Sequence, residues 1–404
     1  MEYRLEELCN ISSSKRIYRK EYQQTGIPFY RGKEIIQKAN NIPISDKLYI
    51  STEKYNEIEQ KYGVPHKGDI LITAVGTIGV SYLVKDERFY FKDGNLIWIK
   101  DFDKKVDNEY LFIYLNSLKF KNELEKIAIG STQRAITIIE LKKIKINIPS
   151  IEIQKKMVKI YKVLDKKIEL NNQVNDNLYE ITSKLYEHIF ITNRSEEWKE
   201  YKLMDIADIY NGYSYKGTEL VEKAKIGMAT IKNFDRTGRF KEDGFKPLEP
   251  LKSKNVHFAE KFDVLVACTD LTQNADIIGD TIMLLSKKGH DKVIISMDLV
   301  KVMPKLEYVN NYMLYSILSS KEFKNFALGY TSGTTVLHLN KNCFKEFSIK
   351  LPDKIEIKKF IKTVEPMYLR ISEIMEENKT LEQLRDTLLP KLMNVEINLD
   401  NIKI

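Results

Sequence analysis

VDNEYLFIYLNSLKFKN, at residues 106–122, returns later in the chain as VNNYMLYSILSSKEFKN at residues 309–325. The match extends from 106–189 to 309–392 at one constant step of 203 residues, without a gap. In front of these segments the correspondence is looser, so the two halves share a frame and have diverged on their N-terminal sides. A period of this length is far too long for one solenoid unit, so each half is expected to be a domain with its own core.

Within each half, strand signals give way to helix signals. β-Branched and aromatic runs bounded by Gly, Asp and Asn predict sheet at 70–84, 89–99, 264–268 and 281–285. After Pro149 and Pro352, apolar residues recur at helical spacing over about 40 residues, which corresponds to about 60 Å of helix. Helices of that length exceed what a globular domain needs, so they are expected to pack along each other or along a partner.

The two expected helices carry the same heptad register. Asn175 and Asn378 occupy matching a positions near the middle of each helix, where a buried amide lowers stability and selects register and partner. Because the linker at 193–199 is short, we expect an antiparallel seam in which these two asparagines lie opposite or nearly opposite each other. The alternative is a pair of amphipathic core helices with incidental asparagines. The expected seam residues are Leu164, Ile168, Asn171, Asn175, Leu178, Leu185, Met367, Ile371, Ile374, Asn378, Leu381 and Leu388.

These patterns predict an α+β fold with two tandem-repeat α/β domains, separated by two long helices that form an antiparallel coiled coil with pseudo-twofold symmetry. The expected parts are a first domain at 1–149, a first helical spacer at 150–192, a linker at 193–199, a second domain at 200–352, a second helical spacer at 353–393 and a C-terminal tail at 394–404.

Composition excludes several classes of protein. With 404 residues, 43% apolar and 30% charged, the chain matches ordinary globular usage, and neither a disordered chain nor a membrane bundle fits. Cys9, Cys268 and Cys343 are isolated, which argues against a disulfide framework or a Cys-based zinc site. No apolar signal region opens the chain, and the uncharged stretch 70–84 is too short to span a membrane. We therefore expect a cytoplasmic protein without a membrane partner.

Catalytic motifs are missing from the sequence. It has no Gly-rich phosphate loop, no His-Glu-x-x-His and no nucleophile elbow, and its five histidines are scattered singly. The Gly-x-x-Gly stretch at 76–79 fits a strand-joining turn better than a phosphate site. Asp353 and Glu356 superficially resemble a nuclease core, but Asp353 aligns with Ser150, and both residue types cap helices. No catalytic residue, metal site or cofactor is therefore expected in this chain.

What remains is a pattern suited to binding nucleic acid. The net charge of +8 fits a polyanionic partner without requiring one. Only 11 of the 65 cationic residues are arginines, and three of them fall in one short window among aromatics and amides. Guanidinium forks read guanine edges, amides read adenine, and small hydroxyl residues contact phosphates. For each window, a solvated charged face is the alternative. The candidate DNA-binding residues are Lys15, Arg16, Tyr18, Arg19, Lys20, Tyr22, Gln23, Tyr30, Arg31, Lys33, Thr77, Ser131, Thr132, Gln133, Arg134, Tyr213, Tyr215, Lys216, Lys232, Asn233, Arg236, Arg239, Thr334 and Thr335.

Over essentially its whole length, this arrangement resembles the specificity (S) subunit of type I restriction-modification systems. The segments that carry the resemblance are 3–8, 26–31, 67–79, 130–133 and 148–154, followed by the long helix. The second half repeats them in more degenerate form. There Lys261-Phe262-Asp263 lacks the usual glycine, and the Gly-x-x-Gly turn is missing near 270–276.

The resemblance implies two target-recognition domains, each binding one half of an asymmetric bipartite target in double-stranded DNA. It implies that the helices set the half-site spacing and dock methyltransferase subunits. It also implies no activity alone: two modification subunits would bring S-adenosylmethionine, and two restriction subunits would bring the ATP-driven motor and the nuclease with Mg²⁺. Three alternatives stay open: an S-like recognition subunit of another methylation or phage-defence system, a self-sufficient nuclease or methyltransferase, and a coiled-coil scaffold with incidental basic patches.

Overall fold

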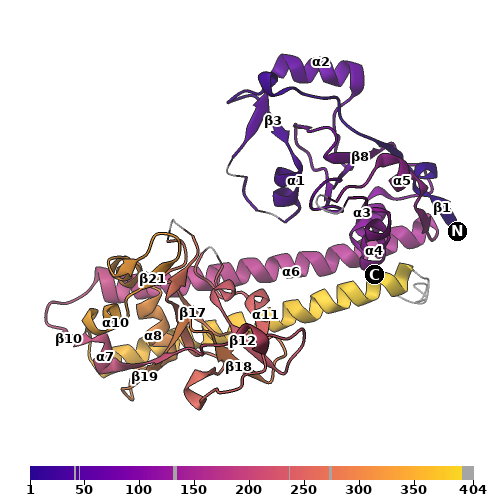
Figure 1. The fold of residues 1–404 in the computed structure, drawn as a ribbon. Helices are drawn as coiled ribbons and strands as arrows, with labels where there is room; N and C mark the ends of the chain where they lie inside the picture. The colour runs from indigo at the N-terminus through magenta and orange to yellow at the C-terminus, as the bar shows by residue number, and fades with distance from the viewer. Residues whose placement is uncertain (41, 45, 131–133, 236, 273–274, 394–404) are drawn as a thin grey trace. The chain divides into compact units, whose positions relative to one another are not determined.

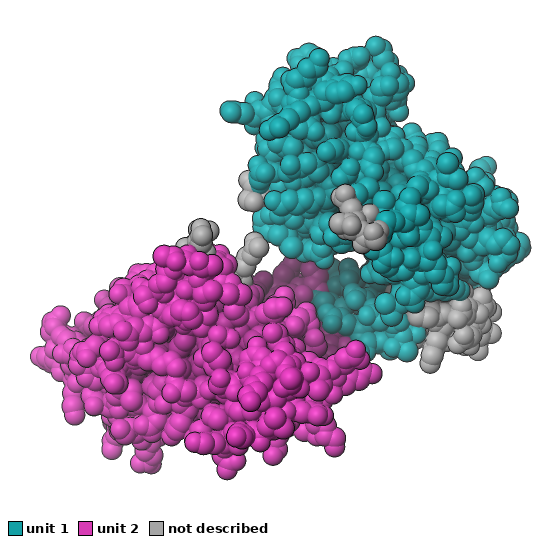
Figure 2. All heavy atoms as spheres, viewed as in Figure 1, with its two compact units in different colours: residues 1–168, 381–404 teal, residues 169–380 magenta. Residues whose placement is uncertain are grey.

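The computed structural model describes residues 1–40, 42–44, 46–130, 134–235, 237–272 and 275–393, with side chains described as far as 387. The chain divides into two compact units (Figure 2): unit 1 holds residues 1–168 and 381–404, and unit 2 holds residues 169–380. Both units mix strands and helices (Figure 1), which confirms the predicted fold class. Among the described helices, none is both long and apolar enough to cross a membrane.

Unit 1 is built on two small sheets and an edge pair. Its four-stranded antiparallel sheet has the order β2 (Asn10–Ser12), β8 (Leu96–Lys100), β5 (Ile70–Thr73) and β6 (Ser81–Leu83). The second sheet has the order β4 (Leu48–Ile50), β3 (Ile27–Tyr30) and β7 (Tyr90–Phe91), with β3 parallel to β7. β1 (Glu2–Arg4) pairs with β9 (Lys145–Asn147). The helices outside the spacer are α1 (Gly32–Ala39), α2 (Thr52–Tyr62), α3 (Asn108–Asn116), α4 (Leu118–Ile127) and α5 (Ile138–Lys143).

The repeat sequence quoted above forms α3 and α4, and local capping explains why it does so. Asp107 accepts hydrogen bonds from the backbone N–H groups of Glu109 and Tyr110, and Ser117 accepts one from Phe120. These two N-caps satisfy donors that the first turn of a helix leaves unpaired. Leu111 and Phe120 are buried in the core of unit 1. The segment therefore forms two short helices that cover the four-stranded sheet.

Unit 2 repeats this topology with matching strand directions. Its four-stranded sheet has the order β11 (Ala207–Asn211), β19 (Leu299–Pro304), β15 (Val264–Ala267) and β17 (Thr281–Met283). The second sheet has the order β13 (Lys246–Pro247), β12 (Ile226–Ala229), β18 (Lys292–Ile295) and β14 (Phe258–Ala259), with β12 parallel to β18. β10 (Lys199–Lys202) pairs with β22 (Ser348–Leu351), and β21 (Leu337–Leu339) lies between β16 (Thr269–Asp270) and β20 (Thr331–Ser332). The helices are α7 (Leu203–Ile206), α8 (Asn311–Leu318), α9 (Lys321–Leu328) and α10 (Asn342–Glu346). The predicted duplication is confirmed.

The two long helices exist as expected. α6 (Ile151–Tyr186) has 36 residues and continues into a π-helical turn, η3 (Glu187–Thr192), while α11 (Lys354–Met393) has 40. At the start of α11, Asp353 Oδ1 accepts from the N–H groups of Ile355 and Glu356 at 2.8 and 3.0 Å. The interpretation of Asp353 as a helix cap, rather than as part of a nuclease core, is confirmed.

Within unit 2 the long helices run antiparallel. The Tyr179 ring lies 6.4 Å from the Tyr368 ring, and the Tyr186 ring lies 6.1 Å from the Phe360 ring. A residue further along α6 therefore contacts a residue earlier in α11. This confirms the predicted antiparallel pairing. The expected seam residues are buried or half-buried, apart from Leu388, whose side chain lies outside the described part.

The asparagines of the seam do not pair as expected. Asn378 accepts from Asn171 and donates to Asn172, both at 2.8 Å, so its amide partners lie one turn before Asn175. Asn175 and Asn378, which were expected opposite or nearly opposite each other, are therefore offset by about one helical turn. An antiparallel pair sets a positions against d positions, and Asn171 occupies a d position. Asn175 is buried as well, and its Oδ1 has no hydrogen-bond partner among the described residues.

We expect these asparagines to have opposite effects on stability. Asn175→Leu removes an unsatisfied buried oxygen, so the free energy of unfolding should rise by about 1 kcal/mol. Asn378→Leu deprives both Asn171 and Asn172 of a hydrogen-bond partner in the seam, so the free energy of unfolding should fall by about 1 to 3 kcal/mol. Denaturant titration of the two variants beside the parent chain measures both changes, and equal effects would contradict the amide pairing seen here.

Candidate nucleic-acid interface

At one edge of unit 1, strand pairing brings several loops together. β3 runs parallel to β7, so Arg31, the first residue after β3, lies beside the turn that follows β7. The Ala74 N–H donates to the Asn95 oxygen at 2.8 Å, which places that turn at the end of β5. The Gly76 N–H donates to the Arg134 oxygen at 2.9 Å, which adds the segment around 134. Loops from distant parts of the sequence therefore share one edge.

This edge contains a groove of about 560 Å³, which we call the unit 1 groove. Three of the predicted DNA-binding residues, Arg31, Lys33 and Thr77, line it together. Sequence reasoning missed the other polar lining residues, Gln37, Asp46 and Asn95, although a polar residue in the turn directly before a strand, as Asn95 is before β8, was a readable signal. The full lining consists of Arg31, Gly32, Lys33, Ile36, Gln37, Asp46, Val75, Thr77 and Asn95.

The Gly-x-x-Gly stretch beside the groove is the strand-joining turn that the sequence favoured, since β5 and β6 pair across it. Gly76 and Gly79 both have φ of +78°, a region that disfavours side chains. A Cβ on Gly79 would also lie 2.8 Å from Leu124 Cδ1. The two glycines therefore set the shape of the loop that presents Thr77.

Arg31 is held in place by a buried carboxylate. Its Nη2 lies 2.6 Å from Glu34 Oε1 and its Nε lies 3.1 Å from Glu34 Oε2, a two-point contact. Burial would raise the pKa of Glu34, but its hydrogen bonds and ion pair with Arg31 outweigh that effect and lower the pKa. The Arg31 side chain is about one-third exposed. Arg31 thus presents a fixed fork at the groove, and a fixed fork suits a bidentate contact better than a mobile one.

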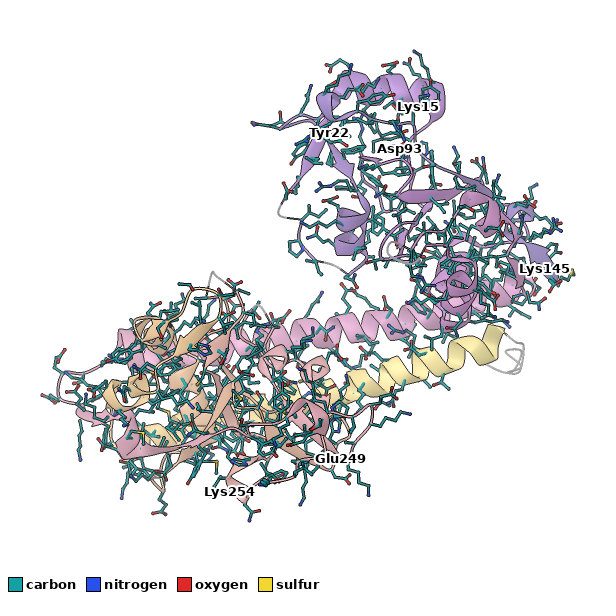
Figure 3. The ribbon with its side chains drawn as sticks, in the orientation of Figure 1. Lys15, Tyr22, Asp93, Lys145, Glu249 and Lys254 are labelled. Atoms are coloured by element: carbon teal, nitrogen blue, oxygen red, sulfur yellow. The ribbon has the colours of Figure 1, made fainter. Side chains whose placement is uncertain are left out.

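The basic window before the groove is only partly exposed. Arg16 forms an ion pair with Asp93 at 2.8 Å, and the Lys15 ammonium lies 5.1 Å from the centre of the Tyr62 ring. Burial raises the pKa of Tyr22, while the charges of Arg31 and Arg19 act in the opposite direction. Lys15, Tyr22 and Asp93 lie in the same part of unit 1 (Figure 3). Besides Lys15 and Arg16, which stay exposed despite these contacts, the exposed candidates of this window are Tyr18, Arg19, Lys20 and Gln23.

Two other candidates in unit 1 have partners inside the fold. Tyr30 is buried, with its ring 4.9 Å from that of Phe89, so the prediction that it contacts DNA is wrong. It belongs to β3, whose last two residues both face cores. Arg134 forms an ion pair with Glu125 and also donates to its backbone oxygen at 3.1 Å. The candidates Ser131, Thr132 and Gln133 lie outside the described residues, as does Arg236 in unit 2.

Unit 2 has a corresponding edge. β12 runs parallel to β18, so Lys232 follows its strand beside the turn at 296–298. The Cys268 N–H donates to the Asp298 oxygen at 2.8 Å, as Ala74 does to Asn95 in unit 1. Thr269 pairs with His338, as Val75 does with Ala135. Lys232, Thr334 and Thr335 are exposed, and their backbone positions place them on the loops of this edge.

Two predicted contacts of unit 2, those of Tyr213 and Asn233, are wrong because these side chains are committed inside the unit. Tyr213 is buried and donates to Glu219 at 2.7 Å. Asn233 is fully buried and holds its own loop through the Thr230 N–H and the Lys241 oxygen, each at 2.9 Å. Tyr215 is half-buried against a small apolar cluster, while Lys216 is exposed.

Arg239 points to the spacer helix instead of away from the unit. It forms an ion pair with Asp176 of α6, and its guanidinium carbon lies 4.9 Å from the centre of the Tyr179 ring. A bridge joins Phe234 and Phe240, so the described part of the loop between them is thereby attached to α6. Arg239 therefore holds this loop against the helix.

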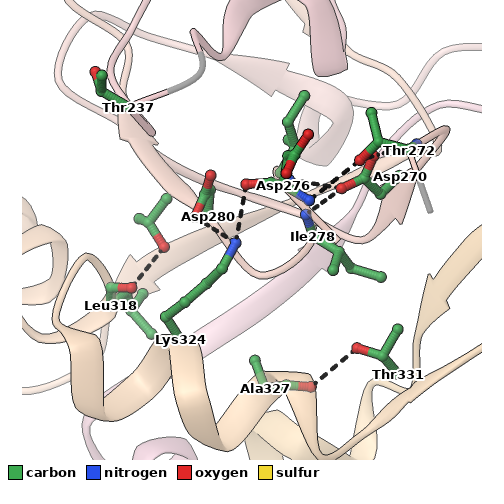
Figure 4. A network of polar contacts seen from close by, with 12 residues as sticks. Thr237, Asp270, Thr272, Asp276, Ile278, Asp280, Leu318, Lys324, Ala327 and Thr331 are labelled. Atoms are coloured by element: carbon green, nitrogen blue, oxygen red, sulfur yellow. Dashed lines mark hydrogen bonds and ion pairs between the residues drawn. The ribbon is translucent and has the colours of Figure 1, made fainter. Parts of the chain in front are cut away.

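A buried carboxylate in unit 2 replaces the missing Gly-x-x-Gly turn, which sequence reasoning did not foresee. Asp270, fully buried, accepts from the Thr272 N–H, the Thr272 hydroxyl, and the N–H groups of Ile277 and Ile278, at 2.6 to 3.1 Å (Figure 4). Burial would raise the pKa of Asp270, but these hydrogen bonds lower it. Lys324 Nζ adds contacts to the Asp276 oxygen at 3.3 Å and to Asp280 at 2.6 Å. A readable signal was the Asp-x-Thr spacing, typical of a side-chain-capped turn.

In the part of the chain that the structure describes, no three His, Cys, Asp or Glu side chains converge to hold a metal ion.

Comparison with known proteins agrees with this geometry. The family model described as "Type I restriction modification DNA specificity domain" matches residues 1–180 and 195–383. The chain therefore belongs to the family of type I restriction-modification specificity subunits. A crystal structure of the type I restriction-modification S subunit from M. genitalium shares the fold, with a TM-score of 0.57 and 17% identity over 97% of this chain and 95% of that one.

Sequence relatives point to the same family. The chain is 36% identical over 178 residues to the putative type I restriction enzyme specificity subunit S.HindORF215P of Haemophilus influenzae, a match that covers 43% of this chain and 42% of that protein. It is 24% identical over 407 residues to the MjaIX specificity subunit of Methanocaldococcus jannaschii, covering 95% of this chain and 89% of the relative. It is 26% identical to the HindI specificity subunit of Haemophilus influenzae, covering 82% and 87%.

We expect Arg31→Lys to weaken recognition while preserving the fold. Lysine keeps the charge beside Glu34 but loses the fork, so specific binding should fall by about 1 to 3 kcal/mol, with specificity relaxed at one base pair. Binding of the variant, assembled with its modification subunits, to single-base variants of the target measures this. Arg4→Lys, on β1 and outside the groove, is the matched control. Unchanged affinity for every target variant would remove Arg31 from the interface.

Proposed function

We propose that this chain is the DNA-recognition subunit of a type I restriction-modification complex and performs no catalysis itself. In this proposal the domain at 1–149 reads one half of an asymmetric bipartite target, and the domain at 200–352 reads the other. Double-stranded DNA is the ligand. The observation that carries the proposal is that one loop-bearing edge occurs twice in the chain with different side chains on it.

The equivalent positions follow from strand register. Arg31, which follows β3, corresponds to Thr230, which follows β12. Asn95 corresponds to Asp298, because Ala74 and Cys268 make the same hydrogen bond to them. Thr230 is buried and its hydroxyl donates to the Gly244 oxygen at 3.1 Å, so the second edge has no counterpart to the arginine fork. The Asn95 amide has donors and an acceptor, whereas the Asp298 carboxylate only accepts. Base edges are told apart by such donor and acceptor patterns, so the two domains are suited to different half-sites.

The spacer helices supply a surface for the other subunits. Leu170, Val174 and Ile181 on α6 are exposed and lie four and seven residues apart, so they share one face of the helix. The seam residues of α6 face α11 instead. An exposed apolar stripe on a helix is typical of a face that packs against a partner helix. We propose that two modification subunits dock on the spacer helices and that two restriction subunits complete the complex.

In this proposal the chemistry enters with the partners. The modification subunits bring S-adenosylmethionine, and the restriction subunits bring ATP and Mg²⁺. Membership of the specificity family supports this division of labour. The second candidate, an S-like recognition subunit of another methylation or defence system, would use the same two edges with different partners.

Exchange of a domain tests the bipartite assignment. Replacing residues 1–149 by the corresponding domain of another family member should change one half-site and leave the other half-site and the gap unchanged. Methylome sequencing of cells that carry the chimera and its modification subunits reads both half-sites at once, and the reciprocal exchange of 200–352 is the matched control. A chimera that alters both half-sites, or a native motif without a gap, would contradict the proposal.

Shortening the spacer tests its role as a ruler. Removal of one matched heptad from α6 and one from α11 shortens each helix by about 10 Å. Because B-DNA rises about 3.4 Å per base pair, the gap between half-sites should shrink by about three base pairs, or binding should be lost. Methylome sequencing gives the new gap. Methylation of the original target at its original spacing would show that the helices do not set the distance.

A further inference from the structure

Unit 2 exposes two large apolar side chains on the loops of its candidate interface. Leu271 is 66% exposed and Met297 is 54% exposed. Leu271 follows β16, and Met297 lies in the turn between β18 and β19. The inference drawn from them rests on the proposed function, in which unit 2 reads one half-site.

Both residues occupy positions of the edge that matches the unit 1 groove. Thr269 pairs with His338 as Val75 pairs with Ala135, so Leu271 corresponds to Thr77, which lines that groove. Asp298 corresponds to Asn95 through the hydrogen bond from Cys268, so Met297 corresponds to Gly94. At these two positions unit 1 has the hydroxyl of Thr77 and a glycine, Gly94. Unit 2 has an apolar side chain at both.

The backbone on either side of Leu271 is fixed. Asp270, directly before it, accepts four hydrogen bonds from Thr272, Ile277 and Ile278, as Figure 4 shows. The Thr272 hydroxyl also accepts from the Asp276 N–H at 3.2 Å. A leucine on a mobile loop could turn inward, but here the neighbours Asp270 and Thr272 are hydrogen-bonded to each other while the Leu271 side chain stays exposed.

Met297 is presented in a similar way. Ser296, directly before it, is fully buried, and its N–H donates to the Ala229 oxygen at 2.9 Å. The Leu299 N–H donates to the Ser296 oxygen at 3.0 Å, which closes a tight turn with Met297 near its tip. Leu271 and Met297 are thus two apolar contacts that are already in position, and such preorganisation reduces the cost of binding.

The chemistry of DNA narrows what these side chains can contact. The edges of the bases are polar in both grooves, with one exception: the 5-methyl group of thymine in the major groove. Lys232 and the hydroxyls of Thr334 and Thr335, on neighbouring loops, suit phosphate contacts at the rim. We propose that Leu271 and Met297 are specificity-determining residues that pack against thymine methyl groups in the half-site read by unit 2.

Removal of the methyl group tests the proposal directly. Methylome sequencing supplies the target, and the domain exchange shows which half-site belongs to unit 2. Duplexes are then made with each thymine replaced in turn by deoxyuridine, which lacks only the 5-methyl group. The assembled methyltransferase should bind about fourfold more weakly for at least one thymine of the unit 2 half-site, the factor that corresponds to one buried methyl group.

Variants link the effect to the two side chains. In Leu271→Ser combined with Met297→Gln, the penalty for deoxyuridine at that thymine should disappear, because no apolar partner for the methyl group remains. Leu251→Ser is the matched control and should keep the full penalty. Leu251 suits this purpose because it is equally apolar and 75% exposed but belongs to a different end of the sheet. It follows β13, whose last residue pairs with Gly227 near the start of β12, whereas Met297 follows the end of β18.

The outcomes separate this inference from the proposed function. If the motif is bipartite but deoxyuridine has no effect in the unit 2 half-site, or that half-site has no thymine on either strand, the methyl contact is wrong and the function stands. If the assembled double variant keeps the full deoxyuridine penalty, the methyl group is contacted elsewhere and the inference is overturned. If the double variant no longer assembles with the modification subunits and the parent complex shows no deoxyuridine penalty, the surface is a protein contact and the inference is likewise overturned. If the complex prefers no sequence at all, the proposed function itself fails.

Discussion

Strand register in the duplicated sheet is the constraint on which the candidate interface depends. β5 lies between β6 and β8, and β15 lies between β17 and β19, with all four residues of both central strands buried. Both faces of these strands are buried, so a slip of one residue would exchange the side chains that pack on the two faces and disrupt both packings. Because register is fixed, the Ala74–Asn95 and Cys268–Asp298 hydrogen bonds recur at equivalent places. The loops beyond them can then change without loss of the frame.

The two copies show how far such change can go. In unit 1 a tight turn with two positive-φ glycines joins β5 to β6, whereas in unit 2 a longer loop is held by the buried carboxylate of Asp270. A further exchange lies in the sheet itself. Trp98 donates to the buried Asp69 at 2.8 Å, while at the equivalent place Lys301 lies 3.7 Å from the buried Asp263. At equivalent positions, a tryptophan in one unit and a lysine in the other lie beside the buried carboxylate. The shared fold therefore accepts a change of residue type at this position, and a change of the same kind on a loop would alter the binding surface.

The sequence was a good guide to the fold and a partial guide to the interface, for physical reasons. Heptads and a short linker predicted antiparallel helices, because both are local patterns. The pairing of Asn378 with Asn171 was missed because it depends on which layers meet between two helices. Arg31 and Glu34 were close enough in sequence for their pairing to be foreseen. Arg16 and Asp93, in contrast, are brought together only by the fold. The burial of Tyr30 and Asn233 follows from packing that no single window of residues encodes.

The placement of charge separates two tasks in DNA recognition. Arg16, Arg31, Arg134 and Arg239, four of the arginines that composition had marked as informative, each have a carboxylate partner within the folded chain. A paired guanidinium adds little net charge, so it contributes less to the salt-dependent attraction for phosphates than an unpaired cation does. It does gain a fixed orientation, which is what reading a base edge requires. Exposed lysines such as Lys20, Lys33 and Lys232 are better suited to the phosphate backbone. In this chain, therefore, arginine geometry and loop shape are the features suited to selecting the sequence, and the lysine excess is the feature suited to attracting DNA of any sequence.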